Sequence, residues 1–178
     1  MLNFLRNYPV FLFLLKAFGL YITWYILYEI WLHPQGKMDL LLINNLILLS
    51  SKILKLIGFR LIEQPIYNEV IRTMGIDGSH GLWIGDACNG LTLFALFTGF
   101  IIAYPGPLIR KLIYIPIGII VIHFMNVLRI VSLSVITLYA PEYLEINHTY
   151  TFTILVYTCV FILWILWANK FSKTKITD

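Results

Sequence analysis

The sequence has little charge. Only 12% of its 178 residues are aspartate, glutamate, lysine or arginine, whereas soluble domains carry roughly 25%, and 60% are hydrophobic. This composition excludes an ordinary soluble domain and indicates an integral membrane protein. The net charge is +4, and the lysines and arginines cluster beside apolar segments. This is typical of proteins whose basic residues set the membrane topology and contact lipid. We therefore expect the lipid bilayer, and no nucleic acid, as a partner.

Cysteine is also scarce. Cys88 lies in a polar, glycine-rich stretch and Cys159 in the last apolar run, and two cysteines form no disulfide framework. With Cys88 at the membrane surface the two sulfurs cannot bridge, because Cys159 lies about 16 Å of helix rise below residue 148. No spacing resembles a zinc or iron–sulfur site, so we expect no metal and no cofactor. Without repeats or low-complexity tracts, residues 1–178 read as a single domain.

Long apolar runs, in contrast, are abundant. Residues 10–32, 90–104, 112–139 and 150–168 are candidates to cross a hydrocarbon core of about 30 Å. The first run is too long for the core of a signal peptide and no small-residue cleavage site follows, so we interpret it as a retained anchor. The predicted fold class is an all-α integral membrane bundle of about four transmembrane helices.

Residues 39–57 form a fifth, weaker candidate. The polar residues of this segment fall largely on one helical face: Asn44, Asn45, Ser51, Lys52 and Lys55. This pattern favours an amphipathic helix lying in the membrane interface over a span. The alternative, a spanning helix, would place the N-terminus outside the cytoplasm, against the charges of Arg6 and Lys16.

Residues 58–86 change in composition to mixed polar and apolar. Asp77-Gly78 is typical of a hairpin turn, and residues 82–84 (Leu-Trp-Ile) resemble a short strand. Because backbone outside a helix cannot face lipid, we expect a small extracytoplasmic β-rich loop that caps the bundle.

Basic residues predict the orientation in the cell membrane. Arg110-Lys111 joins the second and third spans, and Lys170, Lys173 and Lys175 follow the last one. Lysine and arginine mark the cytoplasmic side, so both termini are expected in the cytoplasm.

This topology brings three reactive side chains to one membrane face. Cys88 precedes the second span and His148 precedes the last, and both spans run inward. Arg129 lies 18 residues along the outward third span, about 27 Å of rise, and therefore in the outer leaflet. An intramembrane arginine is by default a hypothesis of a functional site.

The three residue types suit a cysteine nucleophile site. Cys88 lies just before a helix, at the positive end of the helix dipole, which favours the thiolate. His148 would accept or deliver the proton, and Arg129 would stabilise negative charge or bind a substrate carboxylate. His80 is a rival base on the same side of the membrane, although a flexible loop holds a base poorly.

Neighbouring residues supply candidates for binding the substrate and its oxyanion. Asn89-Gly90 allows close approach of the backbone, and free N–H groups at the helix start would bind an oxyanion. Asn126 lies three residues before Arg129 and shares nearly the same helical face. There its amide would orient the substrate or donate a hydrogen bond to it.

These residues resemble motifs of the exosortase/archaeosortase family. Ala87-Cys88-Asn89-Gly90-Leu91 resembles its Cys-Ser-Gly-Leu-type motif, Asn126-x-x-Arg129-Ile130 resembles its Asn-x-x-Arg motif, and His148 resembles its histidine at the start of a final span. The resemblance covers roughly residue 58 to the C-terminus. Asn89 replaces the frequent serine. The chain is shorter than the many-span members, so it looks like a compact branch such as the exosortase F type of Bacteroidetes.

The resemblance implies a membrane cysteine protease or transpeptidase that cleaves a C-terminal sorting signal of membrane-anchored exported proteins through a thioacyl intermediate. It implies Cys88 as nucleophile, His148 as acid/base and Arg129 as electrostatic partner. Non-catalytic alternatives stay open: a membrane scaffold, or a lipid-binding, anion-binding or transport protein that uses Arg129. The sequence indicates no oligomeric state.

Overall fold

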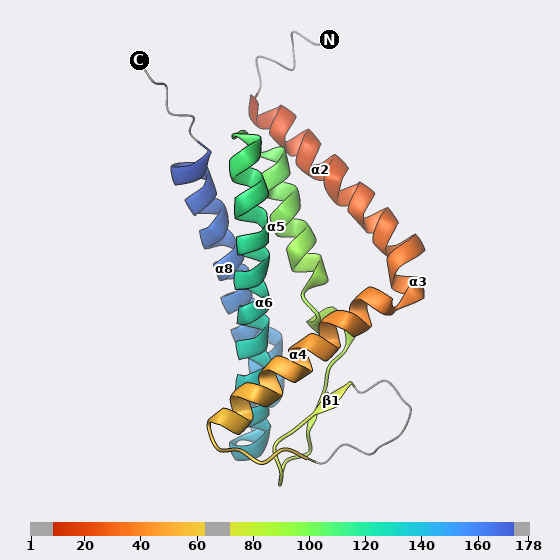
Figure 1. Cartoon of the computed structure of the whole chain (residues 1–178), viewed down its shortest axis with the longest axis vertical. Helices are drawn as coiled ribbons and strands as arrows, with labels where there is room; N and C mark the ends of the chain where they lie inside the picture. The colour runs from red at the N-terminus through yellow and green to blue at the C-terminus, as the bar shows by residue number, and fades with distance from the viewer. Residues whose placement is uncertain (1–8, 63–71, 173–178) are drawn as a thin grey trace.

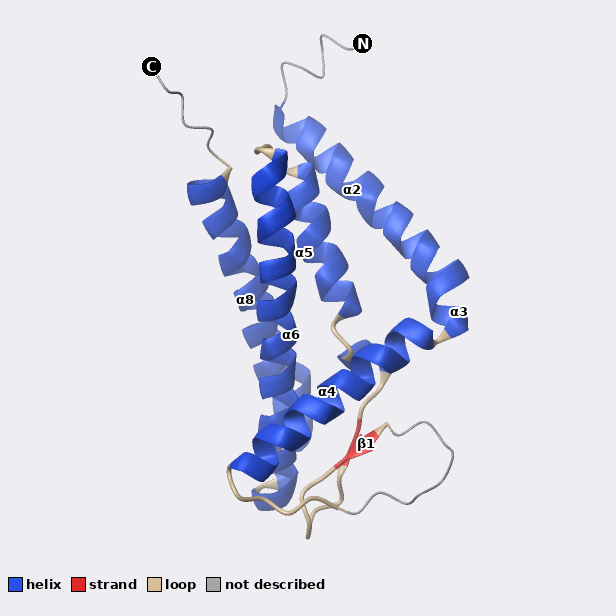
Figure 2. Cartoon of the chain, viewed as in Figure 1, coloured by secondary structure: helices blue, strands red, loops and turns tan. Residues whose placement is uncertain are grey.

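The structure, a computed structural model, describes residues 9–62 and 72–172 and is mostly helical (Figure 2). Three helices in these residues are long and apolar enough to cross a membrane: Val10–Gln35, Leu108–Tyr139 and Pro141–Phe171. A shorter apolar helix covers Leu91–Ala103, and one two-stranded sheet completes the fold. The predicted class, an all-α membrane bundle with a small β-rich loop, is confirmed.

The N-terminal third forms two helices joined at a sharp corner. α2 (Pro9–Leu27) continues through a π-helical turn, η1 (Tyr28–Leu32), into α3 (His33–Gln35). Gly36 ends this helix with a φ of 63°, a left-handed conformation that favours glycine. α4 (Lys37–Leu56) then runs obliquely below α2 and across the lower part of α6 (Figure 1).

α4 buries one face against the bundle. The buried residues recur at helical spacing: Asp39, Ile43, Leu46, Ser50 and Leu54. Its partner is α6, where Ser50 Oγ donates to the carbonyl of Val127 at 3.4 Å. His123 Nε2 also lies 2.8 Å from Asn45 Oδ1. The location of α4 in the membrane interface stays a prediction.

The loop after α4 contains the small sheet. β1 (Thr73–Met74) pairs antiparallel with β2 (Leu82–Trp83), and Leu61 adds a bridge to Ile76. The turn between the strands passes through Gly78 at a φ of 86°. Apolar side chains of this loop join those of α4 and α6 in one core. Residues 63–71 of the expected loop lie outside the described residues.

The remaining helices run side by side (Figure 1). They are α5 (Leu91–Ala103) and α6 (Leu108–Tyr139), the latter uninterrupted at Pro116. Gly118 allows them to approach closely, because a Cβ there would lie 2.1 Å from the ring of Phe97. A second core fills the space between the helices: Leu91, Phe94, Phe97, Ile101, Tyr114, Ile122, Val160 and Trp167.

The last helical stretch changes pitch twice. Short turns, η3 (Pro141–Tyr143) and α7 (Leu144–Ile146), lead into the π-helical turn η4 (Asn147–Thr151). α8 (Phe152–Leu166) and a final π-helical turn, η5 (Trp167–Phe171), follow. The start of α8 lies beside the part of α6 around Arg129, the level at which α5 begins.

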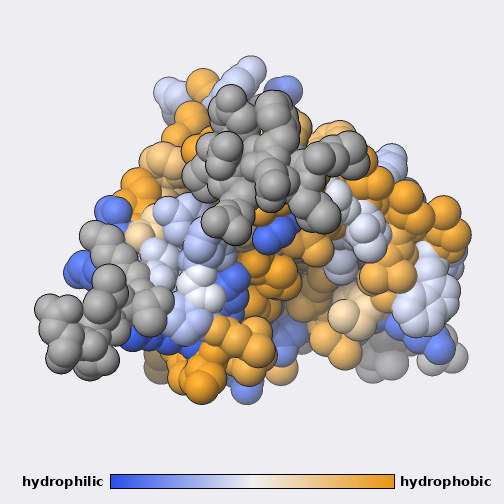
Figure 3. All heavy atoms as spheres, turned by 90° about the horizontal axis from the view of Figure 1, so that it is seen from above, coloured by the Kyte–Doolittle hydropathy of each residue, from blue (hydrophilic) through white to orange (hydrophobic). Residues whose placement is uncertain are grey.

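Basic residues gather at the opposite end of the bundle. Lys111 Nζ donates to the carbonyls of Ile102 and Tyr104 at 2.8 and 2.7 Å, where α5 ends. Arg110 Nη1 donates to the carbonyl of Phe171 at 3.1 Å. Figure 3 views the molecule from this end, with hydrophilic side chains among apolar ones that extend to the rim. The fold is a multi-pass membrane protein, and this end carries Arg110, Lys111 and Lys170.

Candidate active site

Cys88 lies in a short turn that leads into α5. The turn is the 3₁₀ segment η2 (Asp86–Cys88), and the Cys88 N–H donates to the carbonyl of Gly85 at 2.9 Å. An ion pair of 2.6 Å between Arg72 and Asp86 ties this turn to the residue before β1. Cys88 is half-buried, and its thiol is free.

The imidazole of His148 faces the thiol. Cys88 Sγ and His148 Nε2 are 3.6 Å apart, although 60 residues separate them in the chain. His148 lies in η4, a π-helical turn of the kind that occurs often at functional sites. This pair places a proton acceptor beside a potential nucleophile.

Arg129 reaches the same place from α6. Its Nη2 donates to the backbone carbonyl of His148 at 3.4 Å, and Thr153 Oγ1 donates to that carbonyl at 3.3 Å. Within the described residues the Arg129 Nε is buried and has no hydrogen-bond partner. The guanidinium therefore fixes the turn that carries His148 and keeps donor capacity for a further group.

Asn126 presents a buried amide to the start of α5. Only 1% of the residue is exposed, and neither Nδ2 nor Oδ1 has a partner among the described residues. The amide lies directly against Gly90, whose φ is 83° and at which a Cβ would be 2.1 Å from Nδ2. Glycine is therefore required here by both backbone conformation and space.

These side chains line one cleft of about 280 Å³ between α5, α6 and α8. Its walls are formed by Cys88, Gly90, Thr92, Leu93, Asn126, Arg129, Thr153, Val156 and Tyr157. The first turn of α5 opens onto it, and first-turn N–H groups have no acceptor within their own helix. The cleft thus holds a thiol, amide donors and a cation, with an imidazole beside the thiol.

Asn89 does not line this cleft. Its side chain is buried, donates from Nδ2 to Asp39 Oδ1 at 2.5 Å, and accepts the N–H of Leu91 at 2.8 Å through Oδ1. Its backbone N–H donates to the carbonyl of Asp86 at 3.2 Å. The amide that we predicted at the substrate instead caps α5, because Cys88 and Asn89 are successive residues of a 3₁₀ turn and their side chains point in different directions.

The other reactive side chains lie away from the cleft. His80 is exposed in the turn before β2. Cys159 is half-buried on α8, and both cysteines are free, as expected. No group of three or more His, Cys, Asp or Glu side chains is placed to bind a metal in residues 9–62 and 72–172.

Sequence reasoning missed several residues around the site. Asp39 is 1% exposed and contacts Asn89, which follows the nucleophile candidate directly. The available signal was an acidic residue within an apolar segment, since a buried carboxylate requires polar partners. Thr153 and Tyr157 also line the cleft, and lie one and two helical turns after His148.

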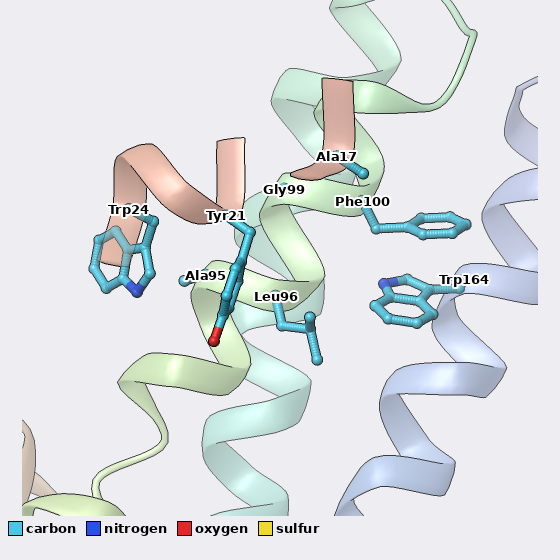
Figure 4. Close-up of a pocket in the computed structure, with 8 residues that line it drawn as sticks. All are labelled: Ala17, Tyr21, Trp24, Ala95, Leu96, Gly99, Phe100 and Trp164. Carbon is cyan, nitrogen blue, oxygen red and sulfur yellow. The ribbon is translucent and has the colours of Figure 1, made fainter. Parts of the chain in front are cut away.

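A second, smaller pocket lies further along α5 and differs in character. It has a volume of about 120 Å³ and is lined by Ala17, Tyr21, Trp24, Ala95, Leu96, Gly99, Phe100 and Trp164. Figure 4 shows the lining side chains arriving from α2, α5 and α8. The rings of Phe100 and Trp164 stack at 4.4 Å between centroids. This pocket contains no acid, base or nucleophile.

The fold and the cleft define a class: a multi-pass membrane protein with a thiol, an imidazole and a guanidinium at one end of its bundle. The model of one family, the transmembrane exosortases (Exosortase_EpsH), matches residues 2–166, and the chain belongs to this family. Membership implies processing of C-terminal sorting signals. The sequence matches no curated protein and no solved structure.

Proposed function

We propose that the chain is a membrane-embedded cysteine peptidase or transpeptidase that cleaves the C-terminal sorting signal of membrane-anchored exported proteins. The observation that carries the proposal is the distance of 3.6 Å between Cys88 Sγ and His148 Nε2, beside a cleft large enough for a peptide segment. Family membership supports the substrate class. The basic residues that directly flank the spans at the far end, Arg110, Lys111 and Lys170, support an extracytoplasmic position for the cleft.

The first step is attack on a peptide carbonyl. His148 accepts the Cys88 proton and the thiolate adds to the carbonyl carbon, which moves an electron pair onto the oxygen. The buried amide of Asn126 and the N–H groups of Thr92 and Leu93, which line the cleft, would donate to that oxyanion. A partner for the Asn126 Nδ2 would offset the cost of its burial.

The second step breaks the peptide bond. The protonated imidazole of His148 donates to the leaving amine, the C–N bond breaks, and a thioester with Cys88 remains. Water, or an acceptor amine or hydroxyl, then attacks the thioester carbonyl carbon as His148 takes its proton. The C–S bond breaks, the product leaves, and the Cys88 thiolate recovers the proton from His148. Arg129 holds the turn that carries the imidazole and supplies a fixed positive charge beside the cleft.

Co-expression with a substrate tests this mechanism. A suitable substrate is an exported protein encoded beside this chain that ends in a short motif, a transmembrane helix and a basic tail. Cys88→Ala should abolish its processing. His148→Ala and Arg129→Ala should slow processing by about 100-fold or more, the range of a lost general base or charge.

The matched control is Cys159→Ala, because it removes the other thiol and leaves the cleft intact. It should process at the parental rate. Normal processing by Cys88→Ala, with membrane levels equal to the parent, would refute the cysteine mechanism. A reporter fused after residue 58 tests the side of the membrane, and a cytoplasmic signal there would reverse the proposed orientation.

A further inference from the structure

A buried carboxylate cluster lies behind the nucleophile segment and has no place in the chemistry described above. We define the Asp39 cluster as Tyr28, His33, Asp39 and Asn89. The Tyr28 hydroxyl donates to Asp39 Oδ1 at 3.0 Å, and His33 Nδ1 lies 3.5 Å from Oδ2. Asn89 Nδ2 donates to Oδ1 at 2.5 Å. Four separate elements thus meet at one side chain.

Asp39 occupies an expensive position. It is 1% exposed, and within the described residues no lysine or arginine forms an ion pair with it. Burial of a carboxylate is costly unless hydrogen bonds and nearby charge offset it. Its place in the first turn of α4 adds the positive end of that helix dipole. The corner at Gly36 sets this position, because it starts α4 beside the preceding π-helical turn.

The cluster continues directly into the active-site segment. The amide nitrogen of Asn89 donates to Asp39, and its amide oxygen accepts the N–H of Leu91. These two bonds fix the residue that follows Cys88 and the first residue of α5. Neither bond faces the cleft, so Asn89 acts through the backbone it holds.

We propose that Asp39 is a positioning residue for Cys88, acting through Asn89. This inference rests on the proposed function. With the Asp39 carboxylate in place, the Asn89 amide is locked, the left-handed turn at Gly90 is held, and the thiol stays beside His148. Without the carboxylate, Asn89 is buried with an unsatisfied donor and the segment that carries Cys88 shifts. A displacement of about 1 Å costs on the order of 100-fold in rate.

A polarity swap tests the Asp39–Asn89 bond separately from the fold. All variants carry Cys159→Ala, so Cys88 is the only thiol, and its alkylation by iodoacetamide at pH 7 is followed in purified full-length protein. Processing of the co-expressed substrate is measured in parallel. Asp39→Leu removes the acceptor for the Asn89 amide, and Asn89→Asp sets two carboxylates against each other. The double variant Asp39→Asn/Asn89→Asp restores a donor and an acceptor in reversed order.

Each single variant should alkylate at least tenfold more slowly than the parent and process about 100-fold more slowly. The swap should recover most of both rates. Asp77→Asn is the control, because Asp77 is an exposed carboxylate in the turn between β1 and β2. Its alkylation and processing rates should equal those of the parent. Parental alkylation and processing in Asp39→Leu would overturn the proposal. Equal loss in both single variants and in the swap would also overturn it.

The two proposals fail separately. Normal processing by Cys88→Ala removes the cysteine mechanism, while the alkylation rates still report on the Asp39–Asn89 bond. Processing that requires Cys88 but is unchanged by Asp39→Leu removes only the positioning role.

Discussion

The two hollows along α5 differ in what lines them. The cleft at the start of the helix is bordered by a thiol, an amide, a guanidinium and two threonines, whereas the pocket further along contains aromatic and small apolar side chains. The same helix contributes Gly90 to one and Gly99 to the other. Helix packing alone therefore does not produce a site, since both hollows come from helices in contact.

The difference lies in the kind of polar group that each hollow presents. At the cleft, the Asn126 amide and the Arg129 guanidinium keep buried donor atoms without partners among the described residues. At the apolar pocket, the indole Nε1 of Trp164 is also buried without such a partner, but its ring stacks on Phe100 and supplies neither charge nor an amide. Substitutions at the cleft should therefore change activity, and those at the pocket should change stability.

The largest expected effect separates the two thiols. Cys88→Ala should lower processing by at least about 1,000-fold, because loss of a nucleophile removes the covalent step. Cys159→Ala should retain the parental rate. The measurement is the ratio of processed to unprocessed co-expressed substrate, with membrane levels of each variant determined alongside.

The next largest effect is expected at Asn126, where one substitution should lower activity and raise stability. Asn126→Leu should slow processing by about 100- to 1,000-fold, the cost of one lost oxyanion donor. The same change should raise unfolding stability by about 1 kcal/mol, because a buried amide without a partner is replaced by an apolar group of similar size.

Asn45→Leu is the control for the buried amide. It removes the acceptor of His123 and should lower stability by about 1 kcal/mol without slowing processing. Thermal unfolding in detergent and substrate processing measure the two quantities. A stability loss in Asn126→Leu would contradict the view that its amide is held for a substrate.

The same substitution at two glycines should give opposite results. Gly90→Ala combines a left-handed φ with a Cβ 2.1 Å from Asn126 Nδ2, so it should cost about 1–3 kcal/mol and slow processing by about 100-fold. Gly99→Ala meets nothing within 4 Å in mid-helix and should stabilise by up to about 1 kcal/mol. Equal behaviour of the two variants would remove the contrast between the hollows.

The smallest effect belongs to the apolar pocket. Trp164→Leu removes the stack with Phe100 and should lower stability by about 1 kcal/mol. Processing should stay at the parental rate, measured as for Cys88→Ala. A large loss of processing in a stably inserted Trp164→Leu protein would give this pocket a role in the reaction.

Much of the fold follows from the sequence, because long apolar runs and basic flanks constrain a membrane protein strongly. The predicted segments 10–32, 90–104, 112–139 and 150–168 all fall on helices, and the hairpin signal at Asp77-Gly78 lies between paired strands. Which helices cross the bilayer, and in which direction, remains a prediction.

The site could be predicted in part. Helix arithmetic placed Cys88, Arg129 and His148 at one level, and they lie together there. The direction of the Asn89 side chain could not be foreseen, since it depends on the 3₁₀ turn that carries Cys88 and Asn89. Asp39 was missed because its partner is 50 residues away and no local pattern links α4 to the start of α5.

The brevity of α5 has a consequence for the depth of the reaction. Thirteen residues rise about 20 Å, roughly 10 Å less than a hydrocarbon core. Lys111 donates to the carbonyls of Ile102 and Tyr104 at the end of α5, and we expect this charge to hold that end at the membrane surface. The shortfall would then fall on the other end, so we expect Cys88 to be recessed below the lipid headgroups. Under the proposed function, a polypeptide cut there would have to uncoil its membrane segment locally, because a carbonyl engaged in helical bonding cannot turn toward the sulfur.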